Sequence, residues 1–77
     1  MPRTSARTNG PAIRANRVRL GLSVRDVVRL LGEQGVQLHE DHLRNLETGA
    51  RRGAREELVA GLAHVLAVPV DSIASTA

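Results

Sequence analysis

The sequence contains no cysteine and no aromatic residue among its 77 residues. Without cysteine the chain can build neither a disulfide framework nor a cysteine-ligated zinc site, which fits a reducing compartment such as the cytoplasm. Without Phe, Trp or Tyr it offers no rings on which unpaired bases stack, and this argues against single-stranded nucleic acid and RNA as partners. A nucleic-acid partner would therefore be a duplex, contacted through its phosphates and its grooves.

Long apolar runs and catalytic motifs are missing as well. No stretch approaches the roughly 20 apolar residues needed to cross a bilayer, and residues 1–11 lack the apolar core of a secretory signal. The sequence has no G-x-S-x-G elbow, no cysteine nucleophile and no glycine-rich phosphate loop after a strand. We therefore expect a cytoplasmic protein without enzymatic activity, without a cofactor or metal, and without a membrane or a small-molecule substrate as partner.

The positive charge of the chain comes from arginine alone, because lysine is absent. Guanidinium groups bind phosphates and base edges through two parallel hydrogen bonds, so this composition suits a nucleic-acid partner. The net charge of +3 is unevenly distributed, since residues 1–29 carry seven Arg against one Asp and residues 30–77 carry four Arg against seven acidic residues. A polyanion is thus expected to meet the N-terminal part first.

The length of the chain supports one domain with a single small core. Residues 1–11 are polar and lack an apolar period, so we expect a flexible basic arm there. Residues 12–74 form the expected helical domain, and residues 75–77 the expected frayed C-terminus. No alternating strand pattern occurs, which predicts an all-α fold of about five short helices.

Capping and stop signals divide this domain into helices. Residues 12–20 follow Pro11 and precede Gly21, which predicts a first helix. The pair Ser23 and Asp26 has the spacing of a capping box at the start of a second helix, and Gly35 is suited to end it in the left-handed conformation. The apolar stripe of this second helix is Val24, Val27, Val28 and Leu31.

A third helix is expected to start at His39 and to end at Gly49, with Leu43 and Leu46 pointing inward. Two glutamates at positions 56 and 57 favour the start of a fourth helix. Its expected buried residues are Leu58, Leu62, Val65 and Leu66. Pro69 ends this helix, and residues 70–73 can form a short closing helix.

The order of several runs along the chain carries a resemblance to a known family. The runs are Ile13-Arg14-x-x-Arg17, Gly21-Leu22-Ser23, Val27-Val28-x-x-Leu31-Gly32, Leu43-x-x-Leu46-Glu47-Thr48-Gly49-x-Arg51-Arg52, and Leu58 to Ile73 with its repeated Leu, Ala and Val. Together they resemble the phage repressor/Cro (Xre-type) helix-turn-helix family over residues 12–73. The resemblance implies a lambda repressor-like fold, and a small transcriptional regulator that binds double-stranded DNA as a dimer with its third helix in the major groove.

The resemblance also implies roles for individual residues. Arg17 and Glu47 match a structural ion pair of the family, and the loop with Arg51 and Arg52 matches one that touches phosphate. Three features depart from the family pattern: the segment 33–37 is longer, Val24 replaces a frequent glutamine, and the third helix starts with two carboxylates. Carboxylates near phosphates lower affinity for DNA, although they can accept hydrogen bonds from cytosine N4 in the major groove.

Two sets of side chains are candidates for DNA contact. The candidates for base reading are His39, Glu40, Asp41, His42, Arg44 and Asn45. The candidates for phosphate contact are Arg3, Arg7, Arg14, Arg25, Arg51 and Arg52. The alternatives are an exposed third helix whose acids only favour the helix dipole, and a disordered tail in place of a groove-binding arm.

The two histidines of the third helix are interpreted as a surface pair or cap and not as a metal site, because their spacing is not that of a zinc motif. We hypothesise that they gain charge near pH 6 and strengthen DNA binding. Two other functions stay open: a protein-interaction module on the same fold, such as an antirepressor or adaptor, and an excisionase-like architectural DNA binder. The candidate dimer contacts are the region after Pro69 and the side chain of Leu30.

Overall fold

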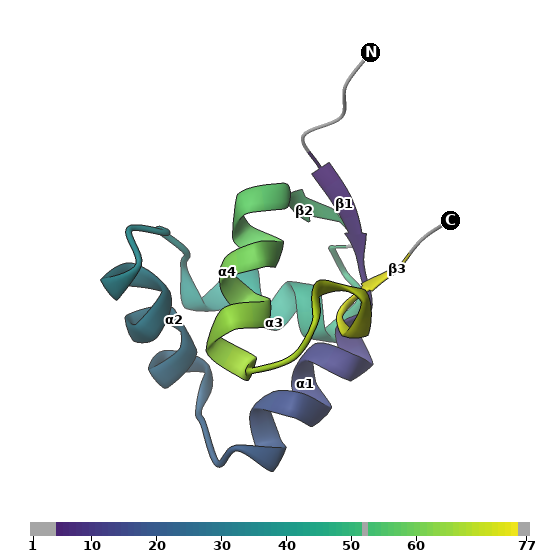
Figure 1. Cartoon of the computed structure of the whole chain (residues 1–77). Coiled ribbons are helices and arrows are strands. Elements are labelled where there is room, and N and C mark those ends of the chain that lie inside the picture. The colour runs from purple at the N-terminus through teal and green to yellow at the C-terminus, as the bar shows by residue number, and fades with distance from the viewer. Residues whose placement is uncertain (1–4, 52, 76–77) are drawn as a thin grey trace.

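In a computed structural model, which describes residues 5–51 and 53–75, helices surround a core and a small sheet lies at one end (Figure 1). The helices are α1 (Gly10–Arg19), α2 (Val24–Glu33), α3 (Glu40–Thr48), α4 (Glu56–Leu66) and the 3₁₀ helix η1 (Val70–Ser72). The strands are β1 (Ser5–Thr8), β2 (Gly53–Arg55) and β3 (Ala74–Ser75). The protein is mostly helical, as predicted. About five short helices were predicted, and the described residues form four α-helices and one 3₁₀ helix.

Side-chain caps fix where α1 and α2 begin. The Asn9 side chain accepts a hydrogen bond from the backbone N–H of Ala12 at 3.2 Å. The predicted capping box of α2 is confirmed, because the Ser23 hydroxyl accepts from the Asp26 N–H at 3.0 Å and the Asp26 carboxylate accepts from the Ser23 N–H at 2.9 Å. These reciprocal bonds satisfy backbone donors that no helical carbonyl can reach.

The segment between α2 and α3 turns the chain and packs on the core. Gly35 has a φ of +82°, in the left-handed region that glycine tolerates, as predicted. Val36 packs against the core, and Leu38 is buried. A Cβ added at Gly61 of α4 would lie 3.4 Å from a Val36 methyl, so this turn contacts α4 closely. The turn therefore contributes to packing.

The ends of α3 and α4 match the prediction. His39 is the N-cap of α3, and its Nδ1 accepts from the backbone N–H of Asp41 at 3.2 Å. Gly49, with a φ of +87°, ends the helix. α4 ends at Leu66, three residues before Pro69.

One apolar core joins all four helices to the sheet. Its fully buried side chains are Ile13, Val27, Leu31, Leu43, Leu46, Leu58, Val59, Leu62, Leu66 and Ile73. The predicted inward positions of α2 and α3 are confirmed at Val27, Leu31, Leu43 and Leu46. Val65 is only half-buried, although it packs against the core as predicted, and Val59, which was not predicted, is fully buried.

The prediction of a strand-free fold with a flexible arm is wrong for the described part of the arm. β1 is the central strand of a three-stranded antiparallel sheet, in which Arg7 pairs with Gly53 of β2 and with Ser75 of β3. The backbone N–H of Asn9 also donates to the carbonyl of Ile73 at 2.8 Å. Strands of two to four residues are too short to show an alternating pattern, because their pairing partners come from distant segments of the chain.

Two predicted boundaries also shift. The first helix begins at Gly10, inside the predicted arm, and Ser75 belongs to β3 although a frayed end was predicted from that residue. Residues 1–4, 52 and 76–77 lie outside the described residues. None of the helices in the described part of the chain is long and apolar enough to cross a membrane.

Candidate nucleic-acid interface

Helix α3 has one face in the core and one face in solvent. Leu43, Leu46 and Glu47 are buried, and α3 contacts α1 and α2. The periodicity of the helix then leaves the predicted base-reading side chains on or near the surface. His39, Asp41, Arg44 and Asn45 are exposed, whereas Glu40 and His42 are half-buried.

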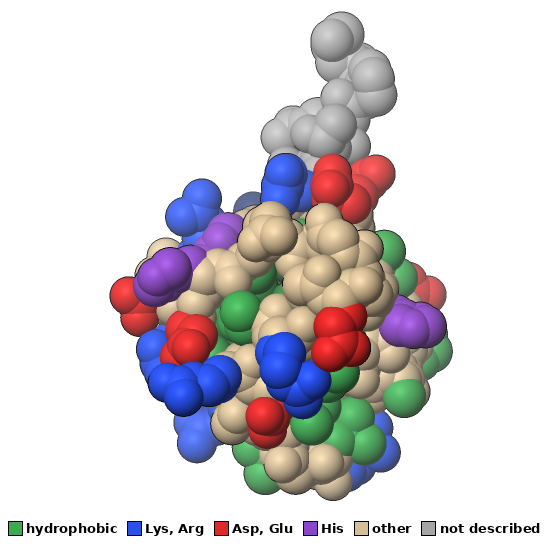
Figure 2. Space-filling model, turned by 90° about the vertical axis from the view of Figure 1, so that its left-hand side faces the viewer, with side chains coloured by type: hydrophobic (Ala, Val, Ile, Leu, Met, Phe, Trp, Pro, Cys, Tyr) green, Lys and Arg blue, Asp and Glu red, His purple; other side chains and the backbone are tan. Residues whose placement is uncertain are grey.

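Charged side chains of both signs are interspersed on the side of the molecule where α2 lies (Figure 2). On α2 itself, Arg29 and Glu33 form an exposed ion pair one helical turn apart, with Nη1 and Oε2 at 3.1 Å. The charge at this surface is therefore partly neutralised locally, and no single sign dominates it.

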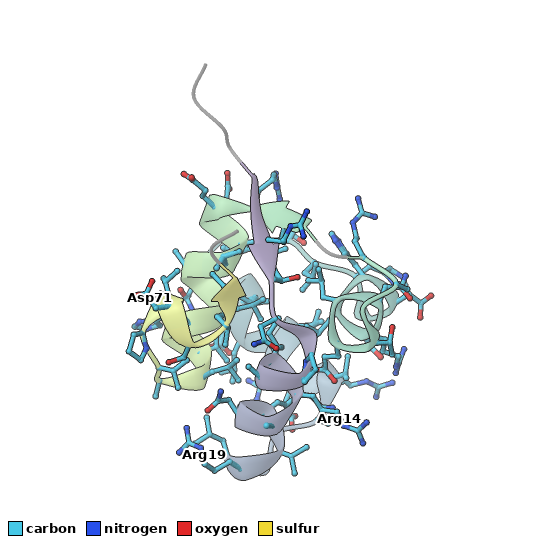
Figure 3. The ribbon with its side chains drawn as sticks, turned by 90° about the vertical axis from the view of Figure 1, so that its right-hand side faces the viewer. Arg14, Arg19 and Asp71 are labelled. Carbon is cyan, nitrogen blue, oxygen red and sulfur yellow. The ribbon has the colours of Figure 1, made fainter. Side chains whose placement is uncertain are left out.

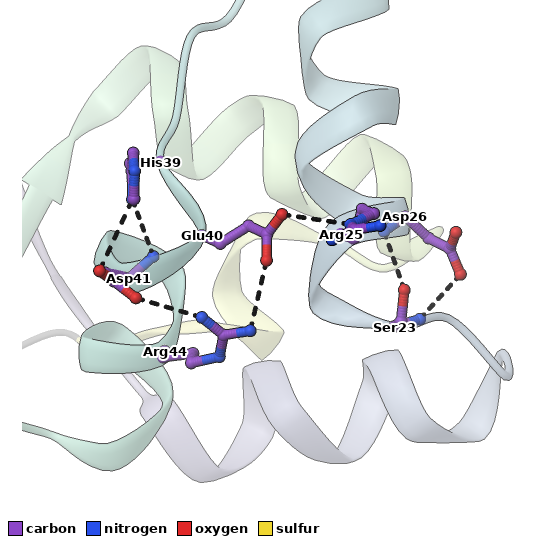
Figure 4. Close-up of polar contacts among 7 residues, drawn as sticks. All are labelled: Ser23, Arg25, Asp26, His39, Glu40, Asp41 and Arg44. Carbon is purple, nitrogen blue, oxygen red and sulfur yellow. Dashed lines mark hydrogen bonds and ion pairs between the residues drawn. The ribbon is translucent and has the colours of Figure 1, made fainter.

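The two carboxylates at the start of α3 contact two of the arginines predicted to contact DNA (Figure 4). Glu40 Oε2 lies 3.4 Å from Arg25 Nε on α2, and Glu40 Oε1 lies 3.3 Å from Arg44 Nη2 on α3. Asp41 Oδ1 lies 3.1 Å from the other guanidinium nitrogen, Arg44 Nη1. Arg44 is thus held between two carboxylates of the preceding helical turn.

The buried end of α3 is tied to α1 by an ion pair. Arg17 Nε and Nη2 donate to the two carboxylate oxygens of Glu47 at 2.7 and 2.8 Å, and Arg17 Nη1 donates to the carbonyl of Leu22 at 2.9 Å. The side chains are 14% and 6% exposed. The hydrogen bonds from Arg17 to Glu47 raise the pKa of that guanidinium. It fixes the orientation of α3 relative to α1.

His42 lies on the side of α3 that turns toward the basic loop. Its Nε2 is buried and has no hydrogen-bond partner among the residues that the structure describes. Burial lowers the pKa of His42, and the positive charges of Arg51 and Arg55 lower it further. Protonation of His42 is therefore disfavoured in the folded protein, which argues against a charge gain by this residue.

His39 combines its role as the N-cap of α3 with a position near Asp41, whose carboxylate lies 3.9 Å from Nδ1. The hypothesis that DNA binding strengthens near pH 6 stays a prediction. Within residues 5–51 and 53–75, no group of three or more metal-ligating side chains is arranged to hold an ion.

Several arginines have no acidic neighbour. Within the described ranges, five lie outside ion-pair distance of every carboxylate: Arg7, Arg14, Arg19, Arg51 and Arg55. Arg14 of α1 points to the side on which α3 lies, whereas Arg19 of the same helix points to the other side (Figure 3). Arg14 and Arg44 also line a hollow of about 250 Å³ between α1, α2 and α3.

The sheet adds an arginine that sequence reasoning missed. In the antiparallel register, Arg7 and Arg55 fall on the same face of β1 and β2, because Ala54 between them is buried on the opposite face. Arg7 and Arg55 are both exposed. Periodicity gave no signal for Arg55, since it lies at the end of a three-residue strand.

The remaining phosphate candidates divide into three groups. Arg51 is exposed in the loop after α3. Arg25 is 84% exposed but is paired with Glu40. Arg3 and Arg52 lie outside the described residues. Among the described residues, Arg14 and Arg51 thus have no carboxylate partner, whereas Arg25 is paired with α3 itself.

No protein-family model, no curated protein and no solved structure matches this chain. A function is therefore inferred from the geometry of α3 and of the arginines around it.

Proposed function

We propose that this protein is a small transcriptional regulator that binds double-stranded DNA sequence-specifically. In this proposal α2 and α3 form a helix-turn-helix, and α3 enters the major groove. The observation that carries the proposal is the exposed polar face of α3, with Arg44 and Asn45, together with two exposed arginines. Arg14 points to the side on which α3 lies, and Arg51 follows α3 with its backbone N–H donating to the carbonyl of Asn45; neither has a carboxylate partner among the described residues.

The dimensions and side chains of α3 suit the major groove. A helix with its side chains is about 10–12 Å wide, and the groove is about 12 Å wide. Arg44 has the donor geometry for guanine O6 and N7, Asn45 suits adenine N6 and N7, and Asp41 can accept from cytosine N4. The buried ion pair of Arg17 with Glu47 holds α3 in one orientation, and sequence reading requires such a fixed orientation.

Arg14 and Arg51 come from different elements, α1 and the loop after α3. Contacts to phosphates on the two sides of a groove position a recognition helix without reading sequence. Each phosphate that an arginine neutralises steepens the salt dependence of binding, with a slope of about −0.9 per contact in log–log form.

The alternative function, a protein-interaction module, rests only on the acidic start of α3. Glu40, however, is only 31% exposed, and its carboxylate contacts Arg25 and Arg44. Asp41 is 75% exposed but also pairs with Arg44, so both carboxylates at the start of α3 already face arginines, which supports DNA over a basic protein partner.

The test is a salt titration of binding to a duplex labelled with fluorescein, because the protein itself has no Trp or Tyr. We expect Arg14→Gln and Arg51→Gln each to reduce the magnitude of the salt slope by about 0.9. Arg19→Gln is the matched control, since Arg19 lies on the same helix as Arg14 but points to the other side. Equal losses in all three variants would indicate that only net charge matters, and would contradict a defined interface.

A further inference from the structure

The arginines best placed to reach DNA from α2 and α3 already have anionic partners in the free protein. Arg25 and Arg44 approach the same carboxylate, Glu40, through its two different oxygens at 3.4 and 3.3 Å. Glu40 is the first residue of α3, and Arg25 is the second residue of α2. One side chain therefore joins the starts of the two proposed helix-turn-helix helices.

Binding to DNA exchanges these partners. At a random site, a phosphate that takes Arg25 or Arg44 only replaces the Glu40 carboxylate, and the carboxylate is left facing a polyanion. At a site with guanine and cytosine in suitable places, Arg44 can bind guanine while the carboxylates accept from cytosine N4. Breaking these ion pairs thus lowers affinity little at the correct site and more at every other site. Specificity is gained in this way by weakening binding to the alternatives.

We propose that Glu40 is a specificity-determining residue, which holds Arg25 and Arg44 in the free protein and so weakens binding to non-cognate DNA. This inference rests on the proposed function of the chain as a duplex-DNA binder. Glu40 fits the role better than Asp41 for two reasons. It contacts arginines on two helices, and its side chain is 31% exposed against 75% for Asp41, so salt screens its pairs less.

The experiment compares Glu40→Gln with a matched control, Glu33→Gln. Glu33 is also an acid paired with an arginine, at 3.1 Å from Arg29, but it lies at the other end of α2. Both replacements raise the net charge of the protein by one and keep the size of the side chain. Dissociation constants and salt slopes are measured on a labelled duplex selected from a random pool and on a scrambled duplex of the same length. Circular dichroism verifies that each variant is folded.

We expect Glu40→Gln to raise affinity for the scrambled duplex about tenfold more than Glu33→Gln does, and to lower the ratio of selected to scrambled affinity. Its salt slope on the scrambled duplex should steepen by up to about 0.9, because Arg25 becomes available to phosphates while Arg44 keeps its ion pair with Asp41. If the two variants behave alike while the wild type prefers the selected duplex, the specificity role of Glu40 is overturned and the proposed function stands. If the wild type binds neither duplex at low salt, both are overturned.

Discussion

At the first residue of α1, the backbone of α3 lies so close that no side chain fits. A Cβ on Gly10 would overlap the carbonyl oxygen of Leu46 and would lie 2.6 Å from the carbonyl oxygen of Glu47. Both are backbone atoms, which cannot move aside without shifting α3. We therefore expect Gly10→Ala to lower the free energy of unfolding by about 3 kcal/mol, in the range of severe overpacking.

The control for this replacement is Gly32→Ala in α2. No atom lies within 4 Å of a Cβ at Gly32, and an alanine there favours the helix by about 0.5–1 kcal/mol. Urea unfolding followed by circular dichroism at 222 nm measures both variants. Similar free energies for the two alanine variants would show that α1 and α3 do not approach as closely as described.

The ion pair of Arg17 with Glu47 is expected to act as a unit. Glu47→Leu alone leaves a guanidinium that is 14% exposed without its carboxylate. We expect this variant to lose about 2 kcal/mol of stability, less than a deeply buried pair would, because the pair borders the hollow between α1, α2 and α3. The double variant Arg17→Met with Glu47→Leu should recover part of that loss. Strictly additive losses, measured by urea unfolding, would show that the two side chains do not interact.

His42 gives a pH dependence of stability whose sign follows from its lowered pKa. In the unfolded chain the pKa of His42 has its ordinary value of 6.5, whereas in the folded protein the pKa is lower. Its contribution to stability is thus fully present above pH 6.5 and is lost as the pH falls through the lower folded pKa. We expect the free energy of unfolding to fall between pH 7 and pH 5, and to fall less in His42→Gln. His64→Gln, at an exposed position of α4, is the control and should keep the wild-type fall.

At the scale of elements, the sheet is the feature that sets this chain apart from a purely helical bundle. β1 is paired on both sides, so a proline within it removes a backbone donor from the ladder. We expect Arg7→Pro to lower the free energy of unfolding by about 1–3 kcal/mol, while Arg7→Gln, which only removes the charge, should change it by less than about 0.5 kcal/mol. Urea unfolding of both variants is the measurement. A proline variant as stable as the wild type would mean that the segment is the flexible arm that composition predicts.

The helices were predictable because their signals are local. The caps at Ser23 and His39 and the stop at Gly49 each lie within a few residues of the bonds they make. The strands were not predictable, since Ser5 pairs with Arg55 and Thr8 with Ala74, and neither partner is near in sequence. Short segments that are stabilised only by distant partners leave no periodic pattern.

The candidate site was predictable in its position and not in its electrostatics. The amphipathic pattern of α3 was enough to place Arg44 and Asn45 on its outer face. The contact of Arg25 with Glu40 depends on how α2 and α3 pack together, because the two residues are 15 positions apart. In the sequence the charges of Arg25 and Glu40 are far apart, whereas the fold brings them into one ion-pair network.

At the scale of the whole molecule, folding redistributes the charge asymmetry of the sequence. Arg25 and Arg29 belong to the strongly basic first 29 residues, yet both are paired with glutamates of the acidic remainder, Glu40 and Glu33. Within the N-terminal part, we therefore expect a polyanion to contact the arginines that are not paired with a carboxylate. Of these, Arg14 faces the side of α3 and Arg19 does not.

The dimer contact stays a prediction at this scale. Val70, just after Pro69, is 43% exposed, which leaves an apolar side chain in the region expected to meet a second copy. Leu30 is half-buried and lines a hollow of about 390 Å³ between α2 and α4.

The measurement that tests the central claim most directly is the ratio of affinities for two duplexes at one salt concentration. One duplex carries the site enriched from a random pool, and the other has the same composition in scrambled order. We expect the enriched site to be bound at least about 10³-fold more tightly, and we expect Asn45→Ala to reduce that ratio about tenfold or more through a lost base contact. A ratio near one, with a steep salt slope and no enriched sequence, would mean phosphate contact alone and would contradict sequence-specific binding by α3.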